Sequence, residues 1–474
     1  MQAGIFNRPN AKNFPAGCGD DSCLVNQTVP AGASAEPVHP EKSDTEAGPA
    51  PPIRNSIGDE GPEADADATF PEGGLAAWLV VLGSFCAMIS VYGIINSAAV
   101  FESYFRTHQL AGYDSSTIGW IFSTYLFLVF FAGIQVGPVF DRYGPRLLVA
   151  AGSLLVVASQ LLLGLCEEYY QILLTYAVLG GLGGALLNVP AYGAIAHFFK
   201  KRRGLATGIA STAGSVGGIV FPFLFQGLLP KLGFGWTTRI GGFIILGLSV
   251  PANLLVRSRL PPTRRRVSGL PLPDWSLFRD LKFTFCCAGV WFMEWGIFIP
   301  LTFIVSYAAA HGQEATDAYT LLAVLNAGSF FGRCLPGLLA DKVGRFNVIV
   351  MTNGLCAATI LGFWLPAGDS RALLIVFAVT FGFASGSNLG LYPVCIGQLC
   401  DARDYGRFYS TALMVGSFGT LTSVPIGGAL LGLGSSEQGW TALIIFSALS
   451  YLIAMSFFLG ARVLAVSWRV KEVF

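Results

Sequence analysis

Twelve long apolar runs separated by short polar segments occupy the sequence from Leu75 almost to its C-terminal end. Each run is long enough to cross the ~30 Å hydrocarbon layer of a bilayer as a helix. In lipid, a helix satisfies its own backbone hydrogen bonds, and the sequence lacks the ~10-residue alternating strands of a membrane barrel. We therefore predict an all-α membrane protein with spans at residues 75–101, 116–140, 146–166, 170–197, 204–228, 237–256, 281–309, 317–340, 346–365, 371–399, 407–432 and 439–462.

The composition excludes the soluble alternatives. Hydrophobic residues make up 53% of the 474 residues and charged residues only 12%, about half the roughly 25% charged fraction of soluble domains. So few polar side chains cannot cover the surfaces of several soluble domains. We expect the lipid bilayer as the main surroundings of the chain, and neither a soluble enzyme nor a nucleic-acid-binding protein.

Charge is distributed unevenly along the chain. Residues 1–72 contain four Lys or Arg and 12 Asp or Glu, whereas the remainder contains 25 basic and 16 acidic residues. The first segment is rich in Pro, Gly, Ala and Ser, a composition that cannot bury enough apolar surface to fold alone. We predict a disordered acidic tail followed by a basic membrane body.

Basic residues gather in alternate loops of this body. The odd-numbered loops hold only Arg106, Lys231 and Arg371, whereas every even-numbered loop carries several Lys or Arg residues. Under the positive-inside rule, the even loops and both termini are cytosolic. We expect the plasma membrane as the location, with the vacuolar membrane as the alternative.

The longest internal loop divides the spans into two groups of six. It covers about residues 257–280 and contains three consecutive arginines and four prolines. The predicted organisation is an acidic tail (1–72), an N-terminal six-helix bundle (73–256), a cytosolic linker (257–280), a C-terminal six-helix bundle (281–462) and a C-terminal tail (463–474).

The two halves of the body repeat one another. Phe130-Phe131, Gly137, Asp141 and Gly144 recur 200 positions later as Phe330-Phe331, Gly337, Asp341 and Gly344. Two six-helix units in the same orientation are typical of parallel-repeat transporters. The acidic and basic residues of the two loops are predicted to pair across helix ends and to hold one face closed; these gating candidates are Asp141, Arg142, Arg146, Asp341, Lys342 and Arg345.

The repeated loop resembles a known family signature. The segment 137–146, Gly-Pro-Val-Phe-Asp-Arg-Tyr-Gly-Pro-Arg, is similar to the loop motif of the major facilitator superfamily, and segment 337–345 is its second copy. The resemblance implies twelve helices in two six-helix halves that work by alternating access. In this superfamily, spans 1, 4, 7 and 10 line the central cavity.

A narrower resemblance extends over most of the body. Segments 72–78, 198–208 and 296–307 resemble motifs of the monocarboxylate-porter family, and segment 392–398 looks most like fungal branches of it. The resemblance places Arg333 on the eighth-helix arginine that binds the carboxylate of the substrate in that family.

Two charged residues lie deep inside predicted spans. Arg333 precedes Asp341 by eight residues, which is about 12 Å along a helix. Its guanidinium keeps its charge, so we expect it to meet an anionic substrate or a carboxylate. Glu294 lies about twelve residues into its span and would hold a proton if isolated, or ionise near Arg333. Either behaviour suits proton coupling, and a purely structural role is the alternative for both residues.

The sequence departs from the proton-coupled lactate carriers of that family. Their first-helix lysine corresponds here to Asn96, and their eighth-helix aspartate corresponds to Ser329. Two of the three charges of the familiar relay are therefore absent. Carboxylate binding through Arg333 stays open, as does transport of a neutral or larger organic solute.

Four polar side chains complete the predicted substrate site. Asn96, Asn188, Asn388 and Tyr392 fall on spans that line the cavity in this superfamily, and Asn188 and Asn388 lie 200 positions apart. The amides could bind substrate by hydrogen bonds, or they could join neighbouring helices instead.

Together these features predict a monomeric secondary active transporter. Its partner would be a small organic solute, monocarboxylate-like or another organic anion, with proton coupling left open. The alternative is an efflux transporter that exports a fungal secondary metabolite. The sequence contains no GxxxxGK[ST] loop, no HExxH motif and no Cys/His cluster, so we expect no ATP-driven pump, no enzyme, no cofactor and no metal site.

Overall fold

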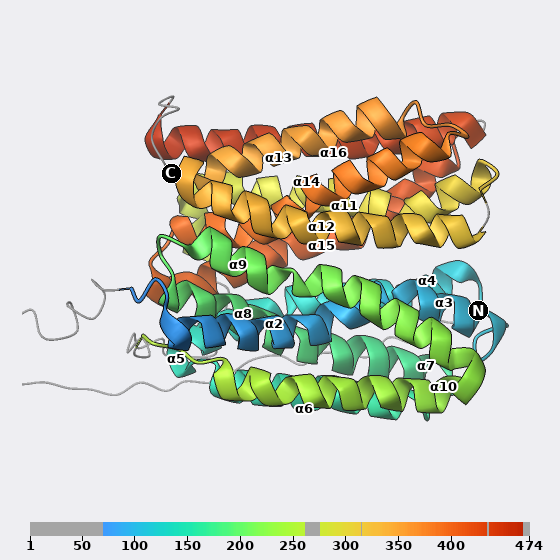
Figure 1. The fold of residues 1–474 in the computed structure, drawn as a ribbon, viewed down its shortest axis with the longest axis horizontal. Helices are drawn as coiled ribbons and strands as arrows, with labels where there is room; N and C mark the ends of the chain where they lie inside the picture. Colours follow the sequence, from blue (N-terminus) through green and yellow to red (C-terminus); the bar gives the residue numbers. More distant parts are fainter. Residues whose placement is uncertain (1–69, 261–274, 314, 434–435, 468–474) are drawn as a thin grey trace, which may run out of the picture. The chain divides into compact units, whose positions relative to one another are not determined.

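The computed structural model describes residues 70–260, 275–313, 315–433 and 436–467. Within these ranges the regular structure is entirely helical (Figure 1), which confirms the predicted all-α class. The helices belong to one compact unit, Glu60–Phe474. The other unit, Met1–Asp59, and with it most of the predicted acidic tail, lies outside the described residues, as does the arginine-rich part of the predicted linker.

The N-terminal half contains most of the short helical segments. It comprises α2 (Gly74–Asn96), α3 (Ala98–Thr107), α4 (Ser115–Phe131), α5 (Gly133–Tyr143), α6 (Arg146–Leu163), α7 (Tyr169–Ile172), the π-helical η1 (Leu173–Leu179), α8 (Gly180–Phe198), α9 (Arg203–Ser211) and α10 (Ala213–Leu255).

The C-terminal half follows with longer helices. It comprises η2 (Trp275–Arg279), α11 (Leu281–Ala310), α12 (Ala315–Val343), α13 (Arg345–Thr359), η3 (Ile360–Trp364), α14 (Arg371–Gln398), η4 (Ala402–Asp404), α15 (Tyr405–Leu431) and α16 (Ser436–Val466).

Eleven continuous helical stretches in the described ranges are long and apolar enough to cross a membrane. One of them, Arg203–Leu255, has 53 residues, or roughly 80 Å of helix, more than twice the thickness of the hydrocarbon layer. It is interrupted at Gly233, whose φ of 73° lies in the region that glycine tolerates best. The stretch therefore contains the fifth and sixth predicted spans, and the eleven stretches accommodate all twelve.

Polar side chains and glycines set several helix ends. Asp114, Asp280 and Ser370 each accept a backbone N–H in the first turn of the helix that follows, which satisfies a donor that a helix start leaves open. Gly144 and Gly344 follow α5 and α12 with φ angles of 77° and 108°. The two copies of the repeated loop thus turn at the same glycine.

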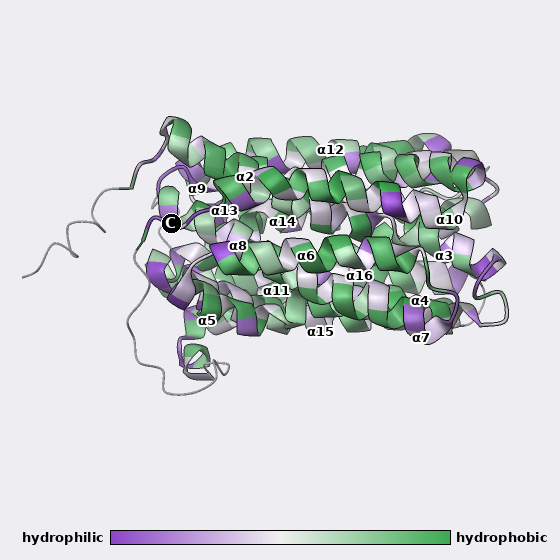
Figure 2. Cartoon of the chain, turned by 90° about the horizontal axis from the view of Figure 1, so that it is seen from below, coloured by the Kyte–Doolittle hydropathy of each residue, from purple (hydrophilic) through white to green (hydrophobic). Residues whose placement is uncertain are grey.

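The helices form two bundles, α2 to α10 below and α11 to α16 above in Figure 1. Glycines let the bundles approach closely, since a Cβ on Gly137 would lie 2.2 Å from the carbonyl oxygen of Gly406. In the second copy, a Cβ on Gly337 would lie 2.6 Å from the carbonyl oxygen of Gly204. Figure 2 shows hydrophobic residues along most of the helices and many of the hydrophilic ones towards the ends of the bundles, as a membrane requires.

Candidate functional site

Arg333 connects the two halves inside the bundle. It projects from α12, and only 8% of it is exposed. Its Nη1 donates a 2.7 Å hydrogen bond to the carbonyl oxygen of Ser211 on α9, and its Nε donates to Ser329 Oγ at 3.3 Å. Within the described ranges Arg333 forms no ion pair with a carboxylate. The expected intramembrane cation therefore lies between the halves, with neutral partners.

Phenol groups from both halves lie in the neighbourhood of this guanidinium. Tyr92 of α2, Tyr192 of α8 and Tyr392 of α14 all lie close enough to interact electrostatically with Arg333. Phenol oxygens can stabilise a cation without neutralising it. The guanidinium has neutral partners among the described residues and keeps its positive charge for a ligand.

These tyrosines are fixed by further contacts. The Tyr92 hydroxyl donates to Asn188 Oδ1 at 3.1 Å, and the Tyr392 and Tyr409 hydroxyls lie 3.4 Å apart. The rings of Tyr192 and Tyr409 pack with their centroids 5.2 Å apart. We refer to Arg333 with Tyr92, Tyr192, Tyr392 and Tyr409 as the arginine–tyrosine cluster.

Asn96 lies beside this cluster. Its Nδ2 donates to the carbonyl oxygens of Tyr92 at 2.8 Å and Gly214 at 3.4 Å. A Cβ on Gly214 would lie 3.1 Å from Nη1 of Arg333. Asn96 and Arg333 therefore both lie against Gly214, which brings two predicted site residues together.

The two repeat-related asparagines differ in their surroundings. Both are fully buried. Asn188 accepts from Tyr92, and its Nδ2 has no hydrogen-bond partner among the described residues, so it offers a donor next to the cluster. Asn388 instead accepts from Thr352 at 2.5 Å and from Asn353, both on α13. For Asn388 the geometry favours a link between helices over contact with a ligand.

Glu294 lies on α11 and is 2% exposed. It packs against α15, where a Cβ added to Gly419 would lie 3.3 Å from the Cβ of Glu294. Its Oε2 has no hydrogen-bond partner, and within the described ranges it makes no ion pair with Arg333. The structure therefore isolates this carboxyl, which is the first of the two situations considered from the sequence. It interacts electrostatically with Tyr392, a member of the cluster.

The two repeated aspartates close one end of the bundle. Asp141 accepts the backbone N–H groups of Gly406 at 2.9 Å and Arg407 at 2.8 Å, at the start of α15. Asp341 accepts those of Gly204 at 2.8 Å and Leu205 at 2.9 Å, at the start of α9. Each carboxylate thus binds the positive end of a helix from the opposite half. We call the end of the bundle that carries Asp141 and Asp341 the motif end.

Across the ranges that the structure describes, the basic residues of the repeated loops are not cross-half partners of these carboxylates. Arg345 lies 3.7 Å from Asp341 of its own half and reaches the other half by hydrogen bonding the carbonyl oxygen of Lys200. Arg142 lies over the ring of Tyr143. The other two, Arg146 and Lys342, are exposed. Backbone amides, which a sequence pattern does not display, replace the expected cations.

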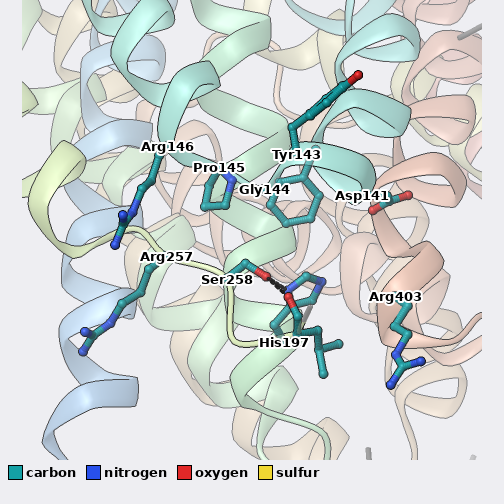
Figure 3. A pocket seen from close by; sticks show the side chains of 11 residues that line it. Asp141, Tyr143, Gly144, Pro145, Arg146, His197, Arg257, Ser258 and Arg403 are labelled. Carbon is teal, nitrogen blue, oxygen red and sulfur yellow. Dashed lines mark hydrogen bonds between the residues drawn. The ribbon is translucent and has the colours of Figure 1, made fainter. Parts of the chain in front are cut away.

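A pocket of about 260 Å³ lies at the motif end, beside Asp141. Figure 3 shows His197 between Ser258 and the chain around Arg403. The imidazole contacts Ser258 Oγ at 2.7 Å and the carbonyl oxygen of Ala402 at 3.0 Å. His197 therefore joins the two halves at the motif end.

Sequence reasoning missed several residues of the site. Tyr192 lies 200 positions before Tyr392, so the repeat itself carried a signal for it. For Tyr92 and Tyr409 the sequence contains no signal beyond their position in a span. Arg203 stands out in the sequence only as part of a basic motif, yet it is buried and donates across the halves to the carbonyl oxygen of Gly397.

Comparison with known proteins extends these observations. Residues 80–423 match the Major Facilitator Superfamily. The chain is 40% identical over 419 residues to the MFS-type transporter opdF of Penicillium oxalicum, covering 87% of this chain and 97% of that protein. It is 36% identical over 425 residues to the aspyridones efflux protein apdF of Emericella nidulans, covering 88% and 85%.

A solved structure shares the fold. The transporter FucP in its outward conformation superposes with a TM-score of 0.63 and 16% identity, covering 81% of this chain and 98% of that one. This similarity confirms the predicted twelve-helix architecture in two halves.

Proposed function

Because the chain belongs to the Major Facilitator Superfamily and is an integral membrane transporter, we propose that it exports a small acidic organic molecule of the kind fungi make as secondary metabolites. The observation that carries the choice of an acid is the arginine–tyrosine cluster. A buried guanidinium with only neutral partners attracts an anion more strongly than it would in water, since the local dielectric constant is low.

The direction of transport is proposed from the relatives. One of them is named as an efflux protein for aspyridones, which favours the export alternative over uptake of a monocarboxylate. The narrower resemblance to monocarboxylate porters stays a prediction, and the absence of the two relay charges at Asn96 and Ser329 weighs against lactate as the cargo.

Alternating access supplies the proposed mechanism. With Asp141 and Asp341 bound to helix ends of the opposite half, the motif end is held together. Opening that end requires the four amide hydrogen bonds of these carboxylates to break, and also the bond from Arg333 to Ser211. In the open state an anionic cargo from the cytosol would bind Arg333 in place of Ser211. The return of Arg333 to Ser211 as the motif end closes would displace the cargo, which couples cargo release to closure of the halves.

Glu294 is the proposed proton site. It is a buried carboxyl whose Oε2 has no hydrogen-bond partner in the described part of the chain, and it lies within electrostatic reach of Tyr392. A proton bound there would be released when rearrangement of the halves hydrates the carboxyl. We further propose a monomer in the plasma membrane with the motif end and both termini in the cytosol, on the evidence of the basic even-numbered loops.

Vesicles of opposite orientation test this function. Inside-out vesicles with an imposed pH gradient should accumulate aspyridones, the cargo of the relative, because cytosolic solute is then outside the vesicle. Right-side-out vesicles offered lactate should show no uptake above vesicles without the protein. Gradient-driven uptake of lactate with no movement of aspyridones would instead support the import reading.

A further inference from the structure

The pocket at the motif end is strongly basic, and its arginines have no role in the proposed transport cycle. Arginines from three segments line it: Arg146 at the start of α6, Arg257 just after α10, and Arg403 in η4. Figure 3 shows Arg146 and Arg257 on one side of it and Arg403 on the other, beside Asp141. Two of these segments belong to the N-terminal half and one to the C-terminal half.

The single acid in the pocket does not balance this charge. Both carboxylate oxygens of Asp141 are occupied by the amides of Gly406 and Arg407. Within the described ranges, no carboxylate forms an ion pair with Arg146 or Arg257. The side of the pocket that carries Arg146 and Arg257 therefore holds an excess of positive charge that a multiply charged anion would neutralise.

We propose that this pocket binds a phosphate monoester, supplied by the headgroup of an anionic phospholipid in the adjacent leaflet. Guanidinium groups bind phosphate by paired hydrogen bonds, and a phosphate monoester presents three terminal oxygens. It can therefore accept from Arg146 and Arg257 (Figure 3) at once and keep an oxygen for a backbone amide, whereas a carboxylate presents only two oxygens. The backbone amides at the start of α6, beside Gly144, add a further attraction for an anion.

The surroundings of the pocket favour a lipid over a soluble ion. Leu147 follows Arg146 directly, and Leu254 precedes Arg257 by three residues. Both are among the most exposed large apolar side chains of the protein. A headgroup in the pocket would thus have apolar side chains next to it for its acyl chains, an arrangement known from basic headgroup pockets between membrane helices.

Such a ligand would lie beside the closed motif end. A phosphate held by Arg146 and Arg257 would join the start of α6 to the chain just after α10, both in the N-terminal half, next to the contacts of Asp141 with α15. Bound lipid would therefore lie beside the contacts that join the halves, without touching the arginine–tyrosine cluster.

Native mass spectrometry of the purified full chain tests the assignment. Protein taken from phosphatidylcholine nanodiscs would be offered phosphatidic acid, a phosphate monoester, or phosphatidylglycerol, a diester with one charge. We expect one phosphatidic acid to be retained in preference to phosphatidylglycerol. Arg257→Gln should weaken its binding on the order of tenfold, as loss of a charged hydrogen-bond donor does. Arg257→Lys should restore part of the loss.

Lys201→Gln is the matched control, since it removes one exposed positive charge that does not line the pocket. It should leave phosphatidic acid binding unchanged. Competition with inorganic phosphate separates the two sources of the anion. Displacement of the lipid by millimolar phosphate would support the site but assign it to a soluble ligand, whereas resistance supports the headgroup.

The proposal would be overturned by equal retention of phosphatidic acid and phosphatidylglycerol. Equal weakening by Lys201→Gln and Arg257→Gln would also reject it, because it would indicate attraction to the whole basic surface. Circular dichroism of each variant would confirm that the helices have formed. The test does not depend on the proposed cargo, since no transport is measured.

Discussion

The guanidinium of Arg333 donates to the backbone carbonyl oxygen of Ser211 across the boundary between the two halves, at 2.7 Å. This buried cation is therefore also a link between the bundles. Cargo binding and the rearrangement of the halves share one side chain, which is what coupling between them requires.

The latch at the motif end can be weakened without altering its shape. Asp141→Asn removes the charge that binds the amides of Gly406 and Arg407, and hydrogen bonds to charged groups contribute about 1.5–3 kcal/mol each. We expect a shift towards the open motif end, seen as faster alkylation of Cys400, which is partly exposed at this end. Peptide mass spectrometry would measure the rate.

Asp341→Asn should produce the same shift, because the second copy of the loop makes the equivalent contacts. Lys201→Gln serves as the control and should leave the alkylation rate unchanged. A rate unaffected by both Asp→Asn variants would contradict the latch.

Substitution of Gly137 tests whether the close approach of the two halves matters for stability. A Cβ there would meet the carbonyl oxygen of Gly406 at 2.2 Å and Ser410 Oγ at the same distance, and backbone cannot move aside cheaply. Gly137→Ala should lower the thermal unfolding midpoint and hold the motif end open. In α10, Gly227→Ala meets nothing within 4 Å and should stabilise the helix by up to about 1 kcal/mol. Similar unfolding midpoints for the two variants would show that the close contact between Gly137 and Gly406 does not contribute to stability.

Substitution of Glu294 tests whether transport is coupled to protons. Glu294→Gln keeps the shape of the side chain but cannot release a proton, so transport should continue down a concentration gradient and lose its response to an imposed pH gradient. Glu437→Gln, on an 82% exposed side chain, is the control and should respond as the wild type does. Flux in vesicles at matched cargo gradients measures the effect, and an unchanged pH response in Glu294→Gln would remove the residue from coupling.

The phenol groups near Arg333 should affect the affinity of the transporter for its cargo. Tyr192→Phe removes one hydroxyl near the guanidinium and should raise the KM for the cargo about threefold to tenfold, the range for one hydrogen bond. Tyr143→Phe removes a hydroxyl from an exposed ring and should leave KM unchanged. If the KM of Tyr192→Phe matched the wild type, the phenol would have no part in the site.

The fold was predictable because hydropathy and internal repetition reflect it directly. Lipid admits only helices for such apolar runs, and the 200-residue displacement alone identifies Asp141 and Asp341 as equivalent positions. The break within the Arg203–Leu255 stretch falls at Gly233, between the predicted fifth and sixth spans.

The site was predictable only in part. Arg333 and Glu294 stood out because charge is costly in lipid, but their separation depends on how α11 and α12 are rotated. The partners of Asp141 are backbone amides, which every residue except proline possesses, so no residue pattern indicates them. Asn188 and Asn388 look equivalent in sequence yet differ in the structure, since α13 offers Thr352 and Asn353 to the second one only.

The central claim is that Arg333 binds the acidic group of the cargo. Its most direct test is the ratio of affinities for an acidic cargo and for its methyl ester, because damage to the fold would affect both ligands alike. In the wild type the acid should bind more tightly on the order of tenfold to a hundredfold, the value of a hydrogen bond between charged groups. Arg106→Ala, which removes an exposed ion pair with Glu102, should preserve that ratio. Arg333→Ala should reduce the ratio to about one, and an undiminished preference for the acid in Arg333→Ala would contradict the account.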